Sequence, residues 1–449
     1  MKKKQVSGEI TAFLSLIFVL LVSFILTLTQ SASIQTSKNQ KRLNADRAVY
    51  SLFGEYQKEL LETYGVFAID GTYQSGAYEE RRLLDRMAYY GNSGTEQEVT
   101  DIQLLTDNQG QAFLEQVLQF MEEKGGIALI RDLTGIAAEW ETRETEGQEM
   151  SESLDGMLTQ GEELLPEEAD GLLEAKSGGI LALVLPEEFR LSAKSIEPGS
   201  QVSNRTRNTG RGSFPARAGT EGIEAKLLFG QYITDSFGSA VDQREGTRNL
   251  DYEQEYILCG KASDEENLRT VVNRLLLFRF AMNAVYLHSS AARQEEAAAA
   301  ALTISVLVLH PEAEEIIRQM LLILWGFGES IMDLRSLLGG KHVPVTKDDT
   351  SWQLQLSALF SLGTENDAQE GRDAQNGLDY GEYLQILFFL NGNAELAMRT
   401  LDRIEQNLIQ ECGLSYFRAD SCVTKLRVQN TADIWNGMTY TFPVYFGYL

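Results

Sequence analysis

The feature that most constrains this chain is an uncharged apolar run near its start, from Ile10 to Leu28. Folded as a helix that rises 1.5 Å per residue, the run would be about 28 Å long, which matches the hydrocarbon core of a bilayer. Lys2, Lys3 and Lys4 precede it, so the positive-inside rule predicts a cytoplasmic N-terminus. No other apolar run is comparably long. We therefore expect a single-pass cell-membrane protein with the bulk of the chain extracytoplasmic.

Three interpretations of this segment remain open. A cleaved signal peptide would have a shorter apolar core followed by a small-x-small site, for which Ser31-Ala32-Ser33 is the candidate. A signal anchor would keep the whole segment. A pilin-like helix would follow a short basic leader, here MKKKQVSG, and Gly8 and Glu9 would then form a prepilin-type processing point.

Small hydroxylated residues recur in the apolar run at separations that are multiples of four: Thr11, Ser15, Ser23 and Thr27. Such a stripe lets a neighbouring membrane helix approach closely, so it is a candidate packing face. The alternative interpretation is that a membrane helix merely tolerates these residues.

Helical spacing continues beyond the apolar run. The apolar positions repeat every three or four residues, at Val49, Leu52, Phe53, Tyr56, Leu60 and Tyr64. We expect a helix that extends from the membrane toward Tyr64, with Gly54 as its weak point because an interior glycine costs about 1 kcal/mol relative to alanine.

Composition excludes several classes of function. The chain has 65 acidic and 39 basic side chains, which give a net charge of −26, so a nucleic-acid partner is not expected. A hydrophobic content of 43% excludes disorder of the whole chain. The three cysteines and three histidines do not occur at zinc-ligand spacing. The sequence contains no nucleophile elbow, P-loop or dinucleotide fingerprint, so we expect no enzymatic activity, cofactor or metal.

A few polar residues are worth following into the structure. Glu329 and Asp333 lie one helical turn apart, and we interpret them as members of a structural ion pair rather than as a shared cation site or an acid–base pair; Arg335 is expected to pair with Glu329 or with another acid. Cys412 and Cys422 are candidates for a disulfide outside the cytoplasm. We expect Cys259 to be a buried thiol. The four tryptophans are interpreted as core anchors: Trp140, Trp325, Trp352 and Trp435.

The predicted fold is α+β and mostly helical, with a membrane helix that extends into a long helix, a helical ectodomain core with short strands, and a C-terminal β element. An apolar run at 178–186 is predicted to be a buried strand, and further strands are predicted at 414–417, 422–428 and 439–448. The predicted segments are a basic leader (1–9), a transmembrane helix (10–30), a stalk (31–65), a first ectodomain part (66–191), a flexible linker rich in arginine (192–222), a helical core (223–411) and the β element (412–449).

Four stretches of the chain carry a family resemblance. They are GEITAFLSLIFVLLVSFILTLTQSASIQTSKNQKRLNADRAVYSLFGEYQKELLETYGVFAID, YEQEYILCGKASDEENL, WGFGESIMDLRSLLGGKHVPVTK and LDYGEYLQILFFLNG. Together they resemble a Gram-positive envelope family of unknown function. The first also resembles TadE/TadG-like minor pseudopilins of tight-adherence pili. One departure is Phe13, which stands where pilins usually place a glutamate five residues after the processed glycine.

The resemblance implies a non-enzymatic, membrane-anchored accessory pseudopilin whose partners are other membrane helices or subunits of a pilus or secretion-type assembly. The alternative is a membrane-tethered extracellular binding or sensor module unrelated to pili. Its ligand is not indicated by the sequence.

Overall fold

The structure is a computed structural model that describes residues 7–125, 133–161, 179–364, 367, 369–435 and 437–448. The chain forms two compact units. Unit 1 comprises Met1–Gln116, Arg207–Ala216 and Leu414–Leu449, and unit 2 comprises Val117–Thr206 and Arg217–Gly413. The segments predicted from the sequence follow one another along the chain, whereas each unit combines segments that are distant in sequence.

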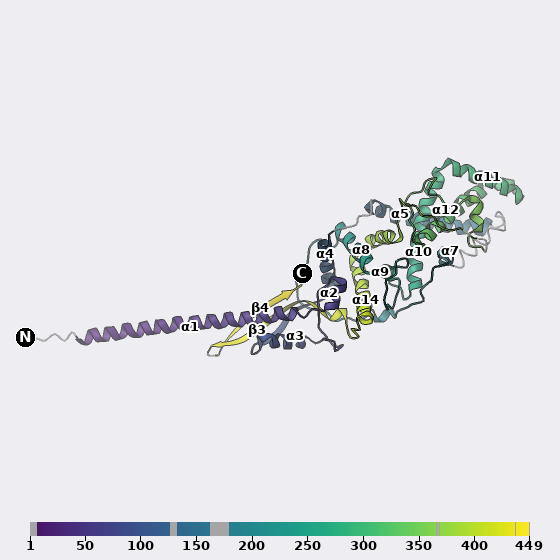
Figure 1. Ribbon diagram of the computed structural model, residues 1–449. Coiled ribbons are helices and arrows are strands. Elements are labelled where there is room, and N and C mark those ends of the chain that lie inside the picture. The colour runs from purple at the N-terminus through teal and green to yellow at the C-terminus, as the bar shows by residue number, and fades with distance from the viewer. Residues whose placement is uncertain are drawn as a thin grey trace, which may run out of the picture. The chain divides into compact units, whose positions relative to one another are not determined.

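Unit 1 begins with the long helix α1, Ser7–Phe53, which contains the whole apolar run (Figure 1). Within the described residues it is the one helix long and apolar enough to cross a membrane. Residues 1–6 of the predicted basic leader lie outside the described residues. The α+β, mostly helical fold class and the extension of the apolar helix beyond residue 30 are confirmed.

Gly54 ends α1, as its low helix propensity predicted. The chain turns there, because the Gln57 N–H donates to the Ala68 carbonyl at 2.8 Å rather than continuing the helix. The helical spacing of apolar residues continues in α2, Lys58–Tyr64, where Leu60 and Tyr64 are buried.

A small antiparallel sheet completes unit 1. Its central strand is β3, Cys422–Trp435, which pairs with β4, Met438–Gly447, on one side. On the other side β3 pairs with β2, Glu96–Leu104, while the short strand β1, Ile69–Asp70, pairs with the start of β3 opposite β2. Two further elements of unit 1 are α3, Glu80–Met87, and a π-helical turn, Ala88–Asn92. The helix α4, Asp107–Lys124, contains the boundary between the units.

The C-terminal part of α1 forms the core of unit 1 together with this sheet. Its buried residues follow the spacing i, i+3, i+4, i+7 and i+8, which places them on one helix face. They pack with the inward face of the strands and with α3, and the main members of this core are Ala45, Ala48, Val49, Leu52, Phe53, Leu83, Val99, Leu104, Leu426, Val428, Phe442 and Val444.

Unit 2 is a helical assembly built around α10, Asp264–Ser289, which packs against α5 and α12. Trp140 on α5 stacks on Phe278 of α10 with ring centroids 4.0 Å apart. Besides α10 and the end of α4, the α-helices that the structure describes in unit 2 are α5 (Leu133–Gly161), α7 (Ile180–Val184), α8 (Ile223–Ser236), α9 (Glu253–Cys259), α11 (Ala291–Leu307), α12 (Glu314–Leu338), α13 (Tyr380–Leu390) and α14 (Asn393–Glu411).

Three sequence predictions about local structure were wrong. Residues 180–184 form the helix α7 rather than a strand, and the predicted residue 178 lies outside the described part. The apolar run at 178–186 is too short for the spacing of its apolar residues to show a helical or a strand period, so its sequence does not distinguish a helix from a strand. Residues 414–417 form a turn instead of a strand. Trp435 is 44% exposed rather than in the core, whereas Trp140, Trp325 and Trp352 are buried.

The predicted linker at 192–222 makes specific contacts. Arg205 pairs with Glu405 in unit 2, and the Ser203 hydroxyl donates to Asp402 at 2.6 Å. Arg211 pairs with Glu80 in unit 1. These arginines therefore neutralise acids of their own units instead of standing free in solvent.

Candidate functional site

The N-terminal part of α1 is an exposed apolar surface. From Ile10 to Leu28 its large apolar side chains, apart from the partly buried Val22, are 42% to 67% exposed, a larger continuous apolar surface than soluble monomers usually expose. Leu20 and Phe24 are typical, at 62% and 63%. This half of α1 is therefore built for an apolar environment, while the half from Ala45 onward belongs to a protein core.

The predicted packing residues all lie on this exposed half. The Ser15 hydroxyl donates to the Ala12 carbonyl and the Thr27 hydroxyl to the Ser23 carbonyl, each at 2.8 Å. These bonds satisfy the hydroxyls within the helix, which leaves a narrow strip of small side chains. At about 100° per residue the strip winds by about 160° from Thr11 to Thr27, so a partner helix would cross α1 at an angle rather than run parallel to it.

The predicted processing point lies at the start of α1. Gly8 is exposed, and a Cβ added there would meet no other atom within 4 Å. The side chain of Glu9 lies outside the described residues. Processing at Gly8 and Glu9 stays a prediction.

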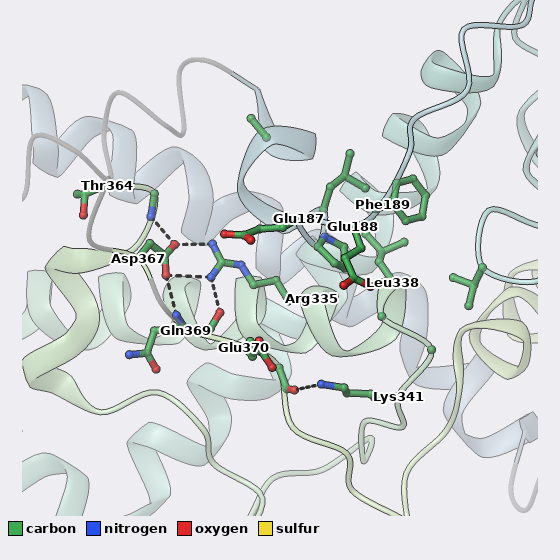
Figure 2. Close-up of a pocket in the computed structure, with 18 residues that line it drawn as sticks. Glu187, Glu188, Phe189, Arg335, Leu338, Lys341, Thr364, Asp367, Gln369 and Glu370 are labelled. Carbon is green, nitrogen blue, oxygen red and sulfur yellow. Dashed lines mark hydrogen bonds and ion pairs between the residues drawn. The ribbon is translucent and has the colours of Figure 1, made fainter.

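A second candidate site is a cavity of about 1000 Å³ in unit 2 (Figure 2). One wall is the segment after α7, which contributes Glu187, Glu188 and Phe189. The other walls are the C-terminal end of α12 with its glycine pair, and the loop that contains Asp367 and Gln369. The sequence signal for this site was limited to chain breakers, since Pro186 and Gly339-Gly340 end the two apolar helices that approach it.

Arg335 on α12 connects the walls of the cavity through its hydrogen bonds. Its guanidinium donates to both carboxylate oxygens of Asp367, at 3.1 and 2.6 Å, and to the carbonyls of Leu183 and Gln369, both at 2.8 Å (Figure 2). Burial raises the pKa of Asp367, but the hydrogen bonds from Arg335 outweigh it and keep this pKa below its usual value. The bidentate pair is therefore a structural clamp between α12 and the loop.

The cavity has an acidic and partly apolar lining. With Arg335 neutralised by Asp367, the remaining charged groups are Glu187, Glu188, Glu370 and Lys341, and the Lys341 ammonium donates to the Gly371 carbonyl at 2.6 Å. Such a lining favours a small ligand with a cationic group. Within the described residues, no group of three or more His, Cys, Asp or Glu side chains is arranged to hold a metal ion.

The predicted ion-pair network exists, but with other partners. Glu329 and Asp333 both contact the Lys347 ammonium at 2.6 Å, and Asp333 also pairs with Arg279 at 2.9 Å. All four side chains are fully buried. Burial raises the pKa of Glu329, whereas the two cations keep the pKa of Asp333 below its usual value despite its burial. Of the two partners expected for Arg335, Glu329 or another acid, the structure shows another acid, Asp367.

A buried carboxyl on α9 gave no sequence signal. Glu255 is inaccessible to solvent, and its Oε1 accepts from the Tyr380 hydroxyl at 2.8 Å and from the Ala240 N–H at 2.9 Å. Burial raises the pKa of Glu255 to about 7. The residues that surround Glu255 come from segments far apart in the sequence, so no local sequence pattern predicts that this carboxyl is buried.

The cysteines occupy three different environments. Cys412 is exposed after α14, whereas Cys422 is buried at the start of β3, where its Sγ–H donates to the Arg418 carbonyl at 3.4 Å. Both carry thiols in the structure, and a disulfide between them stays a prediction. Cys259 ends α9 and is half-buried instead of fully buried as expected, and burial raises the pKa of its thiol to about 12.

Comparison with known protein families gives a match over much of the chain. The model of a family of unknown function (DUF5702) matches residues 160–434, which is more than half of the chain. No curated protein and no solved structure matches.

Proposed function

The chain belongs to DUF5702, a family of unknown function, and we propose that it is a non-enzymatic, membrane-anchored extracytoplasmic protein that serves as an accessory, pseudopilin-like subunit of a tight-adherence pilus or secretion-type assembly. In this role α1 spans the membrane and contacts other membrane helices. The acidic remainder of the chain is displayed outside the cytoplasm.

The observation that supports this proposal is the division of α1 into two halves. One continuous helix has an exposed apolar half and a second half, Ala45 to Phe53, that is the core of an antiparallel sheet domain. A helix of this kind transmits the position of its membrane half directly to the folded unit, because no linker intervenes. That coupling is what an assembly subunit needs, and a simple tether does not need it.

The proposal is tested by changing the packing strip. Replacing Ser15 and Ser23 with leucine keeps α1 apolar but fills the strip, so copurification with the membrane platform of the assembly should fall several-fold. The matched control replaces Ile17 and Ile25 with leucine, which changes exposed apolar positions on the opposite face of α1 from the strip. Equal copurification of both double variants would refute the role of the strip.

N-terminal sequencing of the membrane-extracted protein separates the modes of anchoring. A start at Glu9 indicates prepilin-type processing, an intact start indicates a plain anchor, and a start near Ile34 indicates cleavage by signal peptidase. The last result would remove the membrane half of α1 and would overturn the proposal.

The cavity of unit 2 favours a second candidate function, a membrane-tethered binding module. Its volume of about 1000 Å³ is in the range of small-molecule sites. A polyamine such as spermidine is a suitable probe for the acidic lining, and calorimetry should show binding that weakens in a Glu187→Gln, Glu188→Gln variant. Identical titrations of the variant and the unchanged protein would exclude this site.

A further inference from the structure

The turn between β3 and β4 carries an apolar surface that unit 1 does not cover. Trp435 and Met438 are opposite each other in the strand register, and they are 44% and 42% exposed. The sequence from Ile434 to Tyr448 has no charged residue. This hairpin end therefore exposes a tryptophan and a methionine although the other three tryptophans are buried.

The position of the hairpin end can be measured against α1. Strand β4 runs alongside α1, with the Lys38 ammonium 5.1 Å from the Tyr440 ring and the Tyr50 ring 5.7 Å from the Phe446 ring (Figure 1). From Tyr440 to Phe446 the strand advances about 20 Å, and from Lys38 to Tyr50 the helix advances about 18 Å. The axes of β4 and α1 are therefore nearly parallel. A distance along β4 then gives the α1 residue that lies at the same height along the common axis.

This conversion places the hairpin end near the outer limit of the apolar run. Met438 lies two residues, or about 7 Å, beyond Tyr440 in the direction of the α1 N-terminus. On α1 this distance corresponds to four or five residues before Lys38, which is the level of Ser33 and Ile34. The side chains of α1 from Ser23 to Ala32 are exposed, and partial burial begins at Ser33 and Ile34, which agrees with this level.

The same level falls in the headgroup layer of a bilayer that α1 spans. No charge interrupts α1 between Ile10 and Ser37, a length of about 42 Å that equals a bilayer with its headgroups. Ser33 lies about 8 Å beyond Leu28, the last residue of the apolar run, and within this uncharged length. Lys38 is the first charged residue after it, and Lys38 is also the residue that contacts Tyr440.

We propose that the β3–β4 hairpin end is a second membrane contact, in which Trp435 and Met438 enter the outer headgroup layer of the bilayer that α1 spans. This inference rests on the proposed function, because α1 must remain as the anchor. Tryptophan is favoured at this depth, since its ring is apolar and its N–H still reaches water or headgroups. The hairpin end lies to one side of α1, so its contact with the membrane fixes the rotation of α1 about its own axis. A membrane helix without a second contact is free to rotate about that axis.

Lipid quenching of tryptophan fluorescence tests the inference on the full chain reconstituted in phosphatidylcholine vesicles. Brominated lipids are compared with unbrominated ones, with the bromines placed either near the headgroup or deep in the acyl chain. We expect shallow bromines to quench more than deep ones, and Trp435→Phe to abolish most of the quenching. The matched control adds Tyr416→Trp to the Trp435→Phe protein, because Tyr416 is exposed and precedes the start of β3, the end of that strand remote from the hairpin. This added tryptophan should not be quenched.

Flotation of the vesicles separates the two possible failures. Protein that floats with the vesicles but is quenched equally with and without Trp435 overturns the hairpin contact and leaves the anchor intact. Protein that does not float overturns the anchor and the hairpin contact together.

Discussion

Neutralising Glu255 should remove a pH dependence from the stability of unit 2. The Glu255 carboxyl is completely buried on α9, and its Oε2 has no hydrogen-bond partner outside its own residue within the described part of the chain. Oε1 accepts from Tyr380 and Ala240, and the charge of the nearby Asp264 opposes ionisation further. Burial is the largest cause that raises the pKa of Glu255 from 4.5 to about 7.

The sign of the effect follows from proton uptake on folding. Since the folded pKa lies above the unfolded one, the stabilising contribution is complete below pH 4.5 and is lost as the pH rises through 7. Each pH unit between the two pKa values corresponds to about 1.4 kcal/mol, so the free energy of unfolding should fall by about 3 kcal/mol over this interval. Glu255→Gln cannot ionise and should lack this fall.

The measurement is urea unfolding of the full chain in mild detergent between pH 5 and pH 8, followed by the fluorescence of the buried tryptophans of unit 2. Glu255→Gln buries an amide N–H₂, which costs about 1–3 kcal/mol at every pH, so the slope with pH is the diagnostic quantity. Glu245→Gln, at an exposed position, controls for the removal of one negative charge. Parallel pH profiles for Glu255→Gln and the unchanged protein would refute the reasoning.

Two further substitutions test other features of unit 2. Lys347→Met should lower the free energy of unfolding by about 3–5 kcal/mol, because Glu329 loses its cation and Asp333 keeps one of two in a fully buried cluster. A loss below about 1 kcal/mol in urea titrations would contradict the network. Leu309→Gly should raise the thermal midpoint by a few degrees, since Leu309 has a φ of +60° that costs a non-glycine residue about 1–2 kcal/mol, and it is 84% exposed. Leu307→Gly, within helix α11, should lower the midpoint instead, and the same sign for both variants would argue against backbone strain.

Long periodic elements could be predicted from the sequence. In α12, Glu314–Leu338, apolar residues recur at helical spacing, and the pair Gly339-Gly340 follows its last residue. The buried face of α1 from Val49 to Phe53 also follows directly from its spacing, as does the break at Gly54. These features depend on patterns that repeat over several turns, so each position supports the others.

Partners that come from distant segments could not be predicted in the same way. Arg335 pairs with Asp367, 32 residues further along the chain, although Glu329 lies much closer in sequence. The choice depends on how the loop after α12 folds back, which no local spacing encodes. Trp435 shows the converse limit, since a tryptophan near the end of a strand has the same local pattern whether its neighbours cover it or leave it exposed.

The central position of β3 also determines when unit 1 can form during synthesis. The apolar face Ala45–Phe53 packs against strands that begin at Cys422, about 370 residues later. At a translation rate of about 5–20 residues per second, this face waits roughly 20–70 seconds before its sheet exists. During that period the apolar face Ala45–Phe53 of the nascent chain remains exposed, close to the apolar run Ile10–Leu28. Folding of unit 1 therefore cannot be complete before Cys422–Gly447 has been synthesised, and its yield depends on what covers the apolar face in the interval.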